Sequence, residues 1–294
     1  MASELALHPI ALSVDVEAWT SATILQETGR VVEPEAAVVT QADTLLKLMR
    51  DAGARATWFF LGEVAEKFPG LVRRVVEAGH ELGVHGFHHH QVSTLGPGRF
   101  RDSIERAKQV VEAAGGCEAP GFRAVDFSIG VGTEWALDEL LDAGFLWDAS
   151  VFPMTLPRYG VSGAPLLPHW ANTPLGRRIF RVPVAVFSVG RIRVPFAGGG
   201  YFRHLPYAAI SAMSRHTLRR RPACFYFHPV EVEASDGLPD LPEELSPPER
   251  ALVLERHRQE KRGRGPDAIR RLLAEFQARP IGDAISPLLS ESTP

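Results

Sequence analysis

Short apolar runs that alternate with amphipathic helical patterns place the strongest constraint on how this chain can fold. The runs at 10–16, 55–61 and 145–152 predict buried strands, whereas 35–53 and 69–79 carry apolar residues at helical spacing. Strands that alternate with helices pair in parallel, because each helix carries the chain back across the sheet. The number of repeats favours a closed or nearly closed barrel, and no glycine-rich dinucleotide turn follows the first strand.

The second half of the chain carries a weaker pattern. Residues 151–200 contain many prolines and glycines, which predicts long loops with one strand at 178–184. A further apolar strand is expected at 223–227. No internal repeat or clear boundary interrupts the chain, so residues 1–294 are predicted to form a single domain with 231–294 as a helical C-terminal extension.

The charge pattern and the cysteines exclude several classes of protein. The formal net charge is −3 with both signs interspersed, so we expect no nucleic-acid partner, and the basic run at 256–264 indicates a solvated helix face. Cys117 and Cys224 are isolated and match no metal or redox spacing. The N-terminus lacks the pattern of a signal peptide, and no apolar run is long enough to span a membrane. These features predict a soluble, cytoplasmic protein.

Four polar residues near predicted strand ends are candidates for a metal site. Asp15 and Glu17 lie two residues apart, so both side chains point to one face of the strand, where a cation relieves their repulsion. His85 and His89 are four residues apart, which on a helical turn places both imidazoles on one side, as in many zinc pairs. Two histidines and one carboxylate leave coordination positions open, which is typical of a catalytic site. The alternative to a metal site is that the two acids are exposed to solvent and the two histidines have structural roles.

Arg123 and His228 each follow a short apolar run. Either residue taken alone is more often structural than catalytic. In parallel barrels, however, the carboxyl ends of the strands meet at one rim, where active sites form. We therefore expect both side chains to join the acids and histidines at that rim. His80, His88 and His90 are expected outside the site, His80 as a residue at a helix end.

Five short motifs in this order resemble the polysaccharide deacetylases with a NodB-type catalytic domain, which are similar to carbohydrate esterase family 4. The motifs are SVDVE (13–17), HGFHH (85–89), GFRA (121–124), WDASVFP (147–153) and FYFHP (225–229). The resemblance covers most of the chain and implies a distorted (β/α)7 barrel. The segment FAGGGYFRHLPY (196–207) and the tail segments HRQEKR (257–262) and IRRLLAEF (269–276) resemble the branch found at bacterial exopolysaccharide and exosortase loci.

The resemblance implies a role for the residues of the first three motifs. Asp15 is expected to act as the general base, held in place by Arg123. Glu17, His85 and His89 are expected to bind a divalent metal ion. Zn²⁺ is the first choice for this ion, with Co²⁺, Ni²⁺ or Mn²⁺ as alternatives.

The last two motifs imply the acid step. His228 is expected to protonate the departing amine, with Asp148 orienting its ring. The implied reaction is the metal-dependent hydrolysis of N-acetyl groups, or other amide-linked acyl groups, on a sugar, a polysaccharide or a lipid-linked saccharide. The family carries a proline two residues after the arginine, where this chain has Val125 followed by Asp126. This departure predicts an altered substrate groove or a loss of catalysis.

Three other interpretations stay open. One is a hydrolase of small amides or ureides on the same fold, with or without a metal. Another is an inactive descendant that binds sugar. A third is a structural zinc protein, which would need a fourth protein ligand that neither cysteine is placed to supply.

Overall fold

The computed structural model describes residues 7–18, 34–156, 159–232, 245–251, 254–255 and 265–290. The basic run at 256–264 lies outside these residues. Within the described part of the chain, no helix is both long enough and apolar enough to cross a membrane.

Seven parallel strands of the described chain curl into a barrel, in the order β10-β1-β2-β3-β4-β5-β7. They are β1 (Ile10–Val16), β2 (Thr57–Phe60), β3 (Glu81–Val84), β4 (Gly121–Phe122), β5 (Trp147–Val151), β7 (Arg178–Pro183) and β10 (Ala223–Phe227). The sheet closes on itself where Val184, just after β7, forms a parallel bridge with Cys224 of β10. The expected distorted barrel is therefore confirmed.

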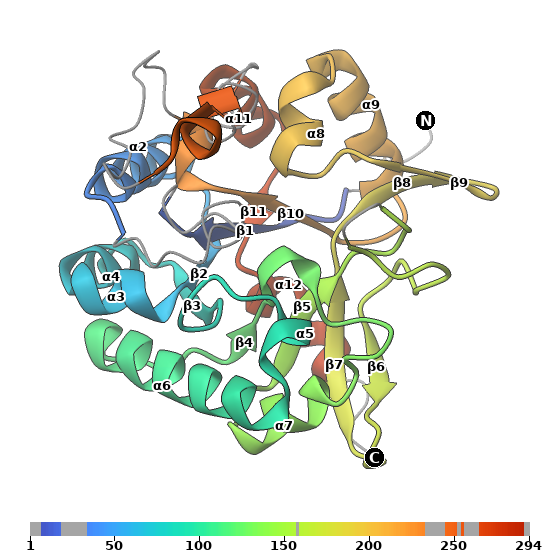
Figure 1. The fold of residues 1–294 in the computed structure, drawn as a ribbon. Coiled ribbons are helices and arrows are strands. Elements are labelled where there is room, and N and C mark those ends of the chain that lie inside the picture. Colours follow the sequence, from blue (N-terminus) through green and yellow to red (C-terminus); the bar gives the residue numbers. More distant parts are fainter. Residues whose placement is uncertain are drawn as a thin grey trace.

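Helices lie around the outside of the curled sheet, as Figure 1 shows. They are α2 (Ala37–Asp51), α3 (Gly62–Lys67), α4 (Pro69–Glu77), α5 (Val92–Leu95), α6 (Pro97–Gly115), α7 (Ala136–Asp142), α8 (Gly199–His204), α9 (Tyr207–Leu218), α11 (Gly265–Glu275) and α12 (Ile281–Ser290). Their boundaries follow local chemistry. For example, α6 begins with Pro97 and is followed by Gly116 in the left-handed conformation, which is the usual asymmetry of helix ends.

The barrel interior has its own apolar cluster, separate from the larger core between the sheet and the helices. Its buried members are Ala11, Phe59, Trp147, Ala149, Phe180, Val182, Cys224, Ile281 and Ile285. Large rings fit there because glycines stand opposite them: a Cβ added at Gly121 would lie 2.0 Å from the Trp147 indole. Small residues on one strand therefore make room for aromatic residues on the next.

Helix α12 covers the amino-terminal ends of the barrel strands. The Ile281 amide donates to Thr57 Oγ1 at 2.7 Å, and the Gly282 amide donates to Glu81 Oε2 at 3.1 Å. These bonds satisfy free N–H groups in the first turn of the helix. The extension expected at 231–294 is thus helical but also enters the sheet, because strand β11 (Ala278–Arg279) pairs with β1. The single-domain boundary itself stays a prediction.

Residues 151–200 hold more strand than the sequence predicted. Strand β6 (His169–Asn172) pairs antiparallel with β7, and β8 (Val186–Val189) forms a hairpin with β9 (Ile192–Pro195). The hairpin turns at Gly190, whose φ of 59° suits glycine. It projects to the side of the barrel, below α8 and α9 in the view of Figure 1.

Candidate active site at the carboxyl ends of the strands

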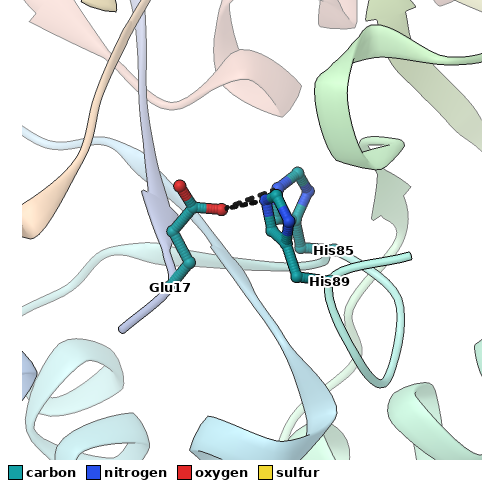
Figure 2. A group of neighbouring side chains, drawn as sticks. All are labelled: Glu17, His85 and His89. Atoms are coloured by element: carbon teal, nitrogen blue, oxygen red, sulfur yellow. Dashed lines mark ion pairs between the residues drawn. The ribbon is translucent and has the colours of Figure 1, made fainter. Parts of the chain in front are cut away.

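Glu17, His85 and His89 come together at the carboxyl-terminal rim of the barrel, as the sequence predicted (Figure 2). Glu17 directly follows β1, and both histidines lie in the loop after β3. Glu17 Oε2 is 2.6 Å from His89 Nε2 and 3.7 Å from His85 Nε2. One ligand atom from each of the three side chains lies within 4.8 Å of the others, which is a suitable spacing for a single metal ion.

The protonation of this cluster is set by its neighbours. His85 Nδ1 donates to the Arg123 carbonyl at 2.7 Å, so Nε2 keeps a lone pair that faces Glu17. Burial by itself raises the pKa of Glu17, but His89 and His85 outweigh it and hold this pKa well below its usual range. Burial by itself lowers the pKa of His89, but the charge of Glu17 and a hydrogen bond to it raise this pKa above its ordinary value. A carboxylate and two imidazoles that converge in this way are a donor set that fits a divalent cation once the imidazoles are neutral.

Asp15 lies beside this cluster and forms a buried ion pair. Its Oδ1 accepts a hydrogen bond from Arg123 Nη1 at 2.6 Å, and the two side chains are 3% and 0% exposed. Arg123 also donates to Ser13 Oγ at 2.8 Å and to the Ala149 carbonyl at 3.2 Å, and its guanidinium stacks 4.4 Å from the Phe59 ring. Burial by itself lowers the pKa of Arg123, but Asp15 raises it above its ordinary value. Arg123 therefore holds the Asp15 side chain in one orientation.

His228, just after β10, also faces the cluster. Its Nε2 is 3.6 Å from Glu17 Oε1. Its Nδ1 donates to Glu231 Oε1 at 2.7 Å, and the same oxygen accepts the His228 backbone N–H at 3.2 Å. Burial by itself lowers the pKa of His228, but the hydrogen bond to Glu231 and the charge of Glu17 raise it to about 9.

The structure does not bring Asp148 to His228, contrary to the expectation. Trp147 and Ala149 point into the barrel, so Asp148, between them on β5, points to the opposite face. There it accepts hydrogen bonds from Arg181 Nε at 2.8 Å and from the Ser150 amide at 3.0 Å. Glu231 takes the place expected for Asp148.

Glu231 is a functional candidate that the sequence reasoning missed. A signal was present, because an acid three residues after a histidine lies on the same side of a helical turn. The 3₁₀ turn Pro229–Val232 supplies this geometry and buries the Glu231 side chain.

The remaining histidines stay outside the cluster, as expected. His80 lies near the amino-terminal end of β3, where its Nδ1 accepts the Ala56 amide at 3.1 Å. His88 is 42% exposed and pairs with Glu63 at 2.5 Å. His90 also lies outside the metal-ligand group.

The departure at Val125 and Asp126 forms a strained turn beside the site. Asp126 and Phe127 have φ angles of 50° and 49°, which residues other than glycine seldom adopt. Gln91 Nε2 donates to Asp126 Oδ2 at 2.8 Å, and the charge of Asp126 acts on His89. The acid that replaces the family pattern is therefore oriented near the candidate metal ligands.

Fold and geometry together define a parallel α/β barrel with a two-histidine, one-carboxylate cluster at its carboxyl rim. Sequence comparison agrees with this class. Residues 35–136 match the model of the polysaccharide deacetylase family, and residues 149–281 match a domain of unknown function (DUF3473). Residues 35–136 therefore carry the sequence pattern of the polysaccharide deacetylase family.

Two curated relatives match shorter stretches. A peptidoglycan-N-acetylglucosamine deacetylase from Bacillus cereus is 32% identical over 26% of this chain and 28% of its own length. A peptidoglycan deacetylase-like protein from Gibberella zeae is 31% identical over 36% of this chain and 31% of its own length. The matched region thus spans less than a third of either relative.

Solved structures share the fold over nearly the whole chain. A protein described as a polysaccharide deacetylase, from Mycobacterium smegmatis, has a TM-score of 0.59 at 16% identity and covers 99% of this chain and 97% of its own. The Puue allantoinase has a TM-score of 0.53 at 16% identity, and the match covers 92% of this chain and 91% of the allantoinase chain. At these identities the likeness shows the barrel alone.

Proposed function

We propose that this chain is a metal-dependent hydrolase that removes N-acetyl groups from a sugar or polysaccharide. The observation that carries the proposal is the convergence of Glu17, His85 and His89 at the rim where two further side-chain pairs are found. One pair is Asp15 with Arg123, and the other is His228 with its carboxylate partner Glu231.

The metal ligands proposed are Glu17, His85 and His89. Their oxygen and imidazole donors suit Zn²⁺ best, and also Co²⁺, Ni²⁺ or Mn²⁺. When bound, such an ion activates water and polarises the acetamide carbonyl. His85 is prepared for this role because the Arg123 carbonyl orients its ring.

The proton transfers are assigned to the two flanking groups. Asp15, oriented by Arg123, accepts the proton of the attacking water. His228 donates a proton to the nitrogen as the C–N bond breaks, because an amine anion is too basic to leave. Glu231 orients His228 by holding Nδ1, so that Nε2 points to the reacting group.

The proposed substrate is an N-acetylated saccharide, free, polymeric or lipid-linked. Support comes from the family and from relatives whose names specify peptidoglycan deacetylation. A role in bacterial exopolysaccharide formation is the finer proposal, and it rests on the resemblance of residues 196–207 and 269–276.

The metal assignment is tested by metal analysis of purified variants. His85→Ala and His89→Ala should each lose stoichiometric Zn²⁺, because two remaining ligands hold the ion poorly. His88→Ala is the matched control, since this neighbouring histidine pairs with Glu63 instead, and it should keep the metal. Stoichiometric metal in a variant lacking both His85 and His89 would contradict the assignment.

The reaction is tested by acetate release from N-acetylated oligosaccharides with metal-reconstituted protein. Asp15→Asn should retain the metal and lose about 10²–10⁴ in rate, the usual share of general acid–base catalysis. If the wild-type, metal-loaded protein releases no acetate from a panel of such sugars, the proposed function is wrong.

A further inference from the structure

Positive charge is concentrated in one continuous part of this chain. Residues 149–230 contain eleven arginines and no aspartate, glutamate or lysine. The chain as a whole carries −3, so the remaining residues together carry −14. This part forms one side of the barrel and the hairpin β8–β9.

Some of these arginines are neutralised by acids from other parts of the chain. Arg177 pairs with Asp138 and Asp142, and Arg215 pairs with Glu275. These ion pairs give Arg177 and Arg215 a structural role, so neither arginine points to a ligand.

Three other arginines have no such partner. Over the part of the chain that the structure describes, no ion pair joins Arg191, Arg193 or Arg221 to a carboxylate. Arg221 is buried, Arg193 is half-buried, and Arg191 is exposed in the hairpin turn. Positive charge gathered without counter-charge favours an anion from solution.

Two of these arginines line a polar cavity of about 570 Å³ between the hairpin β8–β9 and the loop 154–166. The cavity is lined by Arg191 and Arg193, by the hydroxyl-bearing residues Thr155, Ser162 and Ser188, and by Met154, Gly163, Leu166 and Gly190. Ser188 and Arg193 are directly paired across the hairpin, so both side chains lie on the same face. Guanidinium and hydroxyl groups without a carboxylate form a lining that suits an oxyanion.

The hydrogen bonds that Arg193 and Arg221 form near the cavity go to backbone carbonyls and leave the positive charges without a negative partner. Arg193 donates to the carbonyls of Pro153 and Ala164, and Arg221 donates to those of Leu166 and Val186. Neutral carbonyls satisfy N–H groups but cannot cancel two positive charges. Burial and the nearby charge of Arg193 together lower the pKa of Arg221 to about 10.

The loop that lines the cavity also reaches the candidate active site. The Phe127 ring lies 5.7 Å from the Tyr159 ring and 5.4 Å from the Phe152 ring, measured between centroids, and the Tyr159 and Phe152 rings are 5.3 Å apart. Phe127 in turn contacts Tyr226 at 5.1 Å, and Tyr226 lies edge-on to His228 at 5.6 Å. Phe127, Phe152 and Tyr226 are buried, so packed side chains connect the loop that lines the cavity to the histidine of the candidate active site.

We propose that the cavity binds an anionic group of the substrate, a phosphate or a carboxylate carried on a saccharide unit next to the one that is deacetylated. This inference rests on the proposed function, which it narrows to acidic or phosphorylated N-acetylated saccharides. Arg191 and Arg193 bind the anion, and the hydroxyl groups complete its hydrogen bonding.

Calorimetric titration with inorganic pyrophosphate and with glucuronate tests the site without any turnover. The wild-type protein should bind at least one of them, and Arg191→Gln should weaken that binding about tenfold, the effect of losing one charge-assisted hydrogen bond. Arg191 lies in an exposed turn, so this change leaves the packing intact. Arg191→Lys should recover part of the loss, and Arg73→Gln on the exposed face of α4 is the control. Tighter binding of pyrophosphate identifies a phosphate, and tighter binding of glucuronate identifies a carboxylate.

Kinetics separates this site from the catalytic one. With paired N-acetylated oligosaccharides that differ by one phosphate or one carboxylate, Arg191→Gln should raise KM for the anionic member about tenfold and leave kcat unchanged. The neutral member should be unaffected. The proposal would be overturned if the wild type, Arg191→Gln and Arg73→Gln all bound the two anions with the same affinity. It would also be overturned if none of the three proteins bound either anion. If the anion site behaves as described but no oligosaccharide releases acetate, the proposed function fails and the anion site stands.

Discussion

Replacing Arg123 with methionine removes the guanidinium that lies against the Asp15 carboxylate inside the barrel. Methionine fills most of the same volume, so the packing loss is under about 1.5 kcal/mol. The larger effect is electrostatic, because the Asp15 side chain is only 3% exposed and keeps its charge without a counter-ion. Breaking such a buried pair costs about 3–5 kcal/mol, so we expect Arg123→Met to lower the free energy of unfolding by about 4 kcal/mol.

The double variant makes this prediction specific. Asp15→Asn keeps an oxygen acceptor for Arg123 but loses the charge, which should cost about 2 kcal/mol. When both groups are replaced, neither charge is left unpaired. The loss in the double variant should therefore be smaller than the sum of the single losses by about 1–3 kcal/mol.

Urea denaturation at pH 7 measures these energies, with the buried Trp58 and Trp147 as fluorescence reporters and circular dichroism as a second probe. Arg73→Met, on the exposed face of α4, is the matched control and should change stability by less than about 0.5 kcal/mol. A loss below about 1 kcal/mol for Arg123→Met, or single losses that simply add, would refute the buried ion pair.

Three further predictions follow from other parts of the structure. Glu231→Gln should slow amide hydrolysis more than hydrolysis of an activated aryl acetate, because only the amine leaving group depends on a well-oriented His228; equal losses on the two substrates would argue against this role. Burial lowers the pKa of His80 from 6.5 to about 4. Between pH 4 and pH 6.5, His80 is therefore protonated in the unfolded chain but neutral in the folded chain. Stability should therefore fall as the pH drops from 6.5 to 4, by about 3 kcal/mol in total, and denaturation of His80→Gln should show a correspondingly smaller pH dependence. Gly121→Ala should cost about 1–3 kcal/mol, because the added methyl meets a buried indole, whereas Gly98→Ala has open space and should be nearly neutral in thermal denaturation.

Much of the site was determined by the sequence alone. The apolar runs at 10–16 and 223–227 coincide with β1 and β10, since both strands are bounded by polar or turn-forming residues. In a parallel barrel, the residue that follows each strand must lie at the same rim. That rule places Glu17, His85 and His228 together without any knowledge of the loops between them.

The region 151–200 was predicted less well, although one local signal was available. The stretch VFSVGRIRV (186–194) alternates apolar and polar residues around a glycine, a pattern of short hairpins. The frequent prolines and glycines around it favour loops in the same window. The hairpin then depends on contacts with other segments, such as Phe187 against His216 of α9 at 5.0 Å.

Only the tertiary structure decided which carboxylate serves His228 and where the unpaired arginines gather. Strands β5 and β10 are buried on both faces, so their residues show no alternation of apolar and polar side chains that would reveal which ones point inward. Closure of the barrel turns Asp148 outward to Arg181 and leaves Glu231 beside His228. The cavity at Arg191 and Arg193 likewise forms between segments distant in the sequence, because residues 154–155 and 162–166 lie against the hairpin β8–β9, where Arg193 donates to the Ala164 carbonyl.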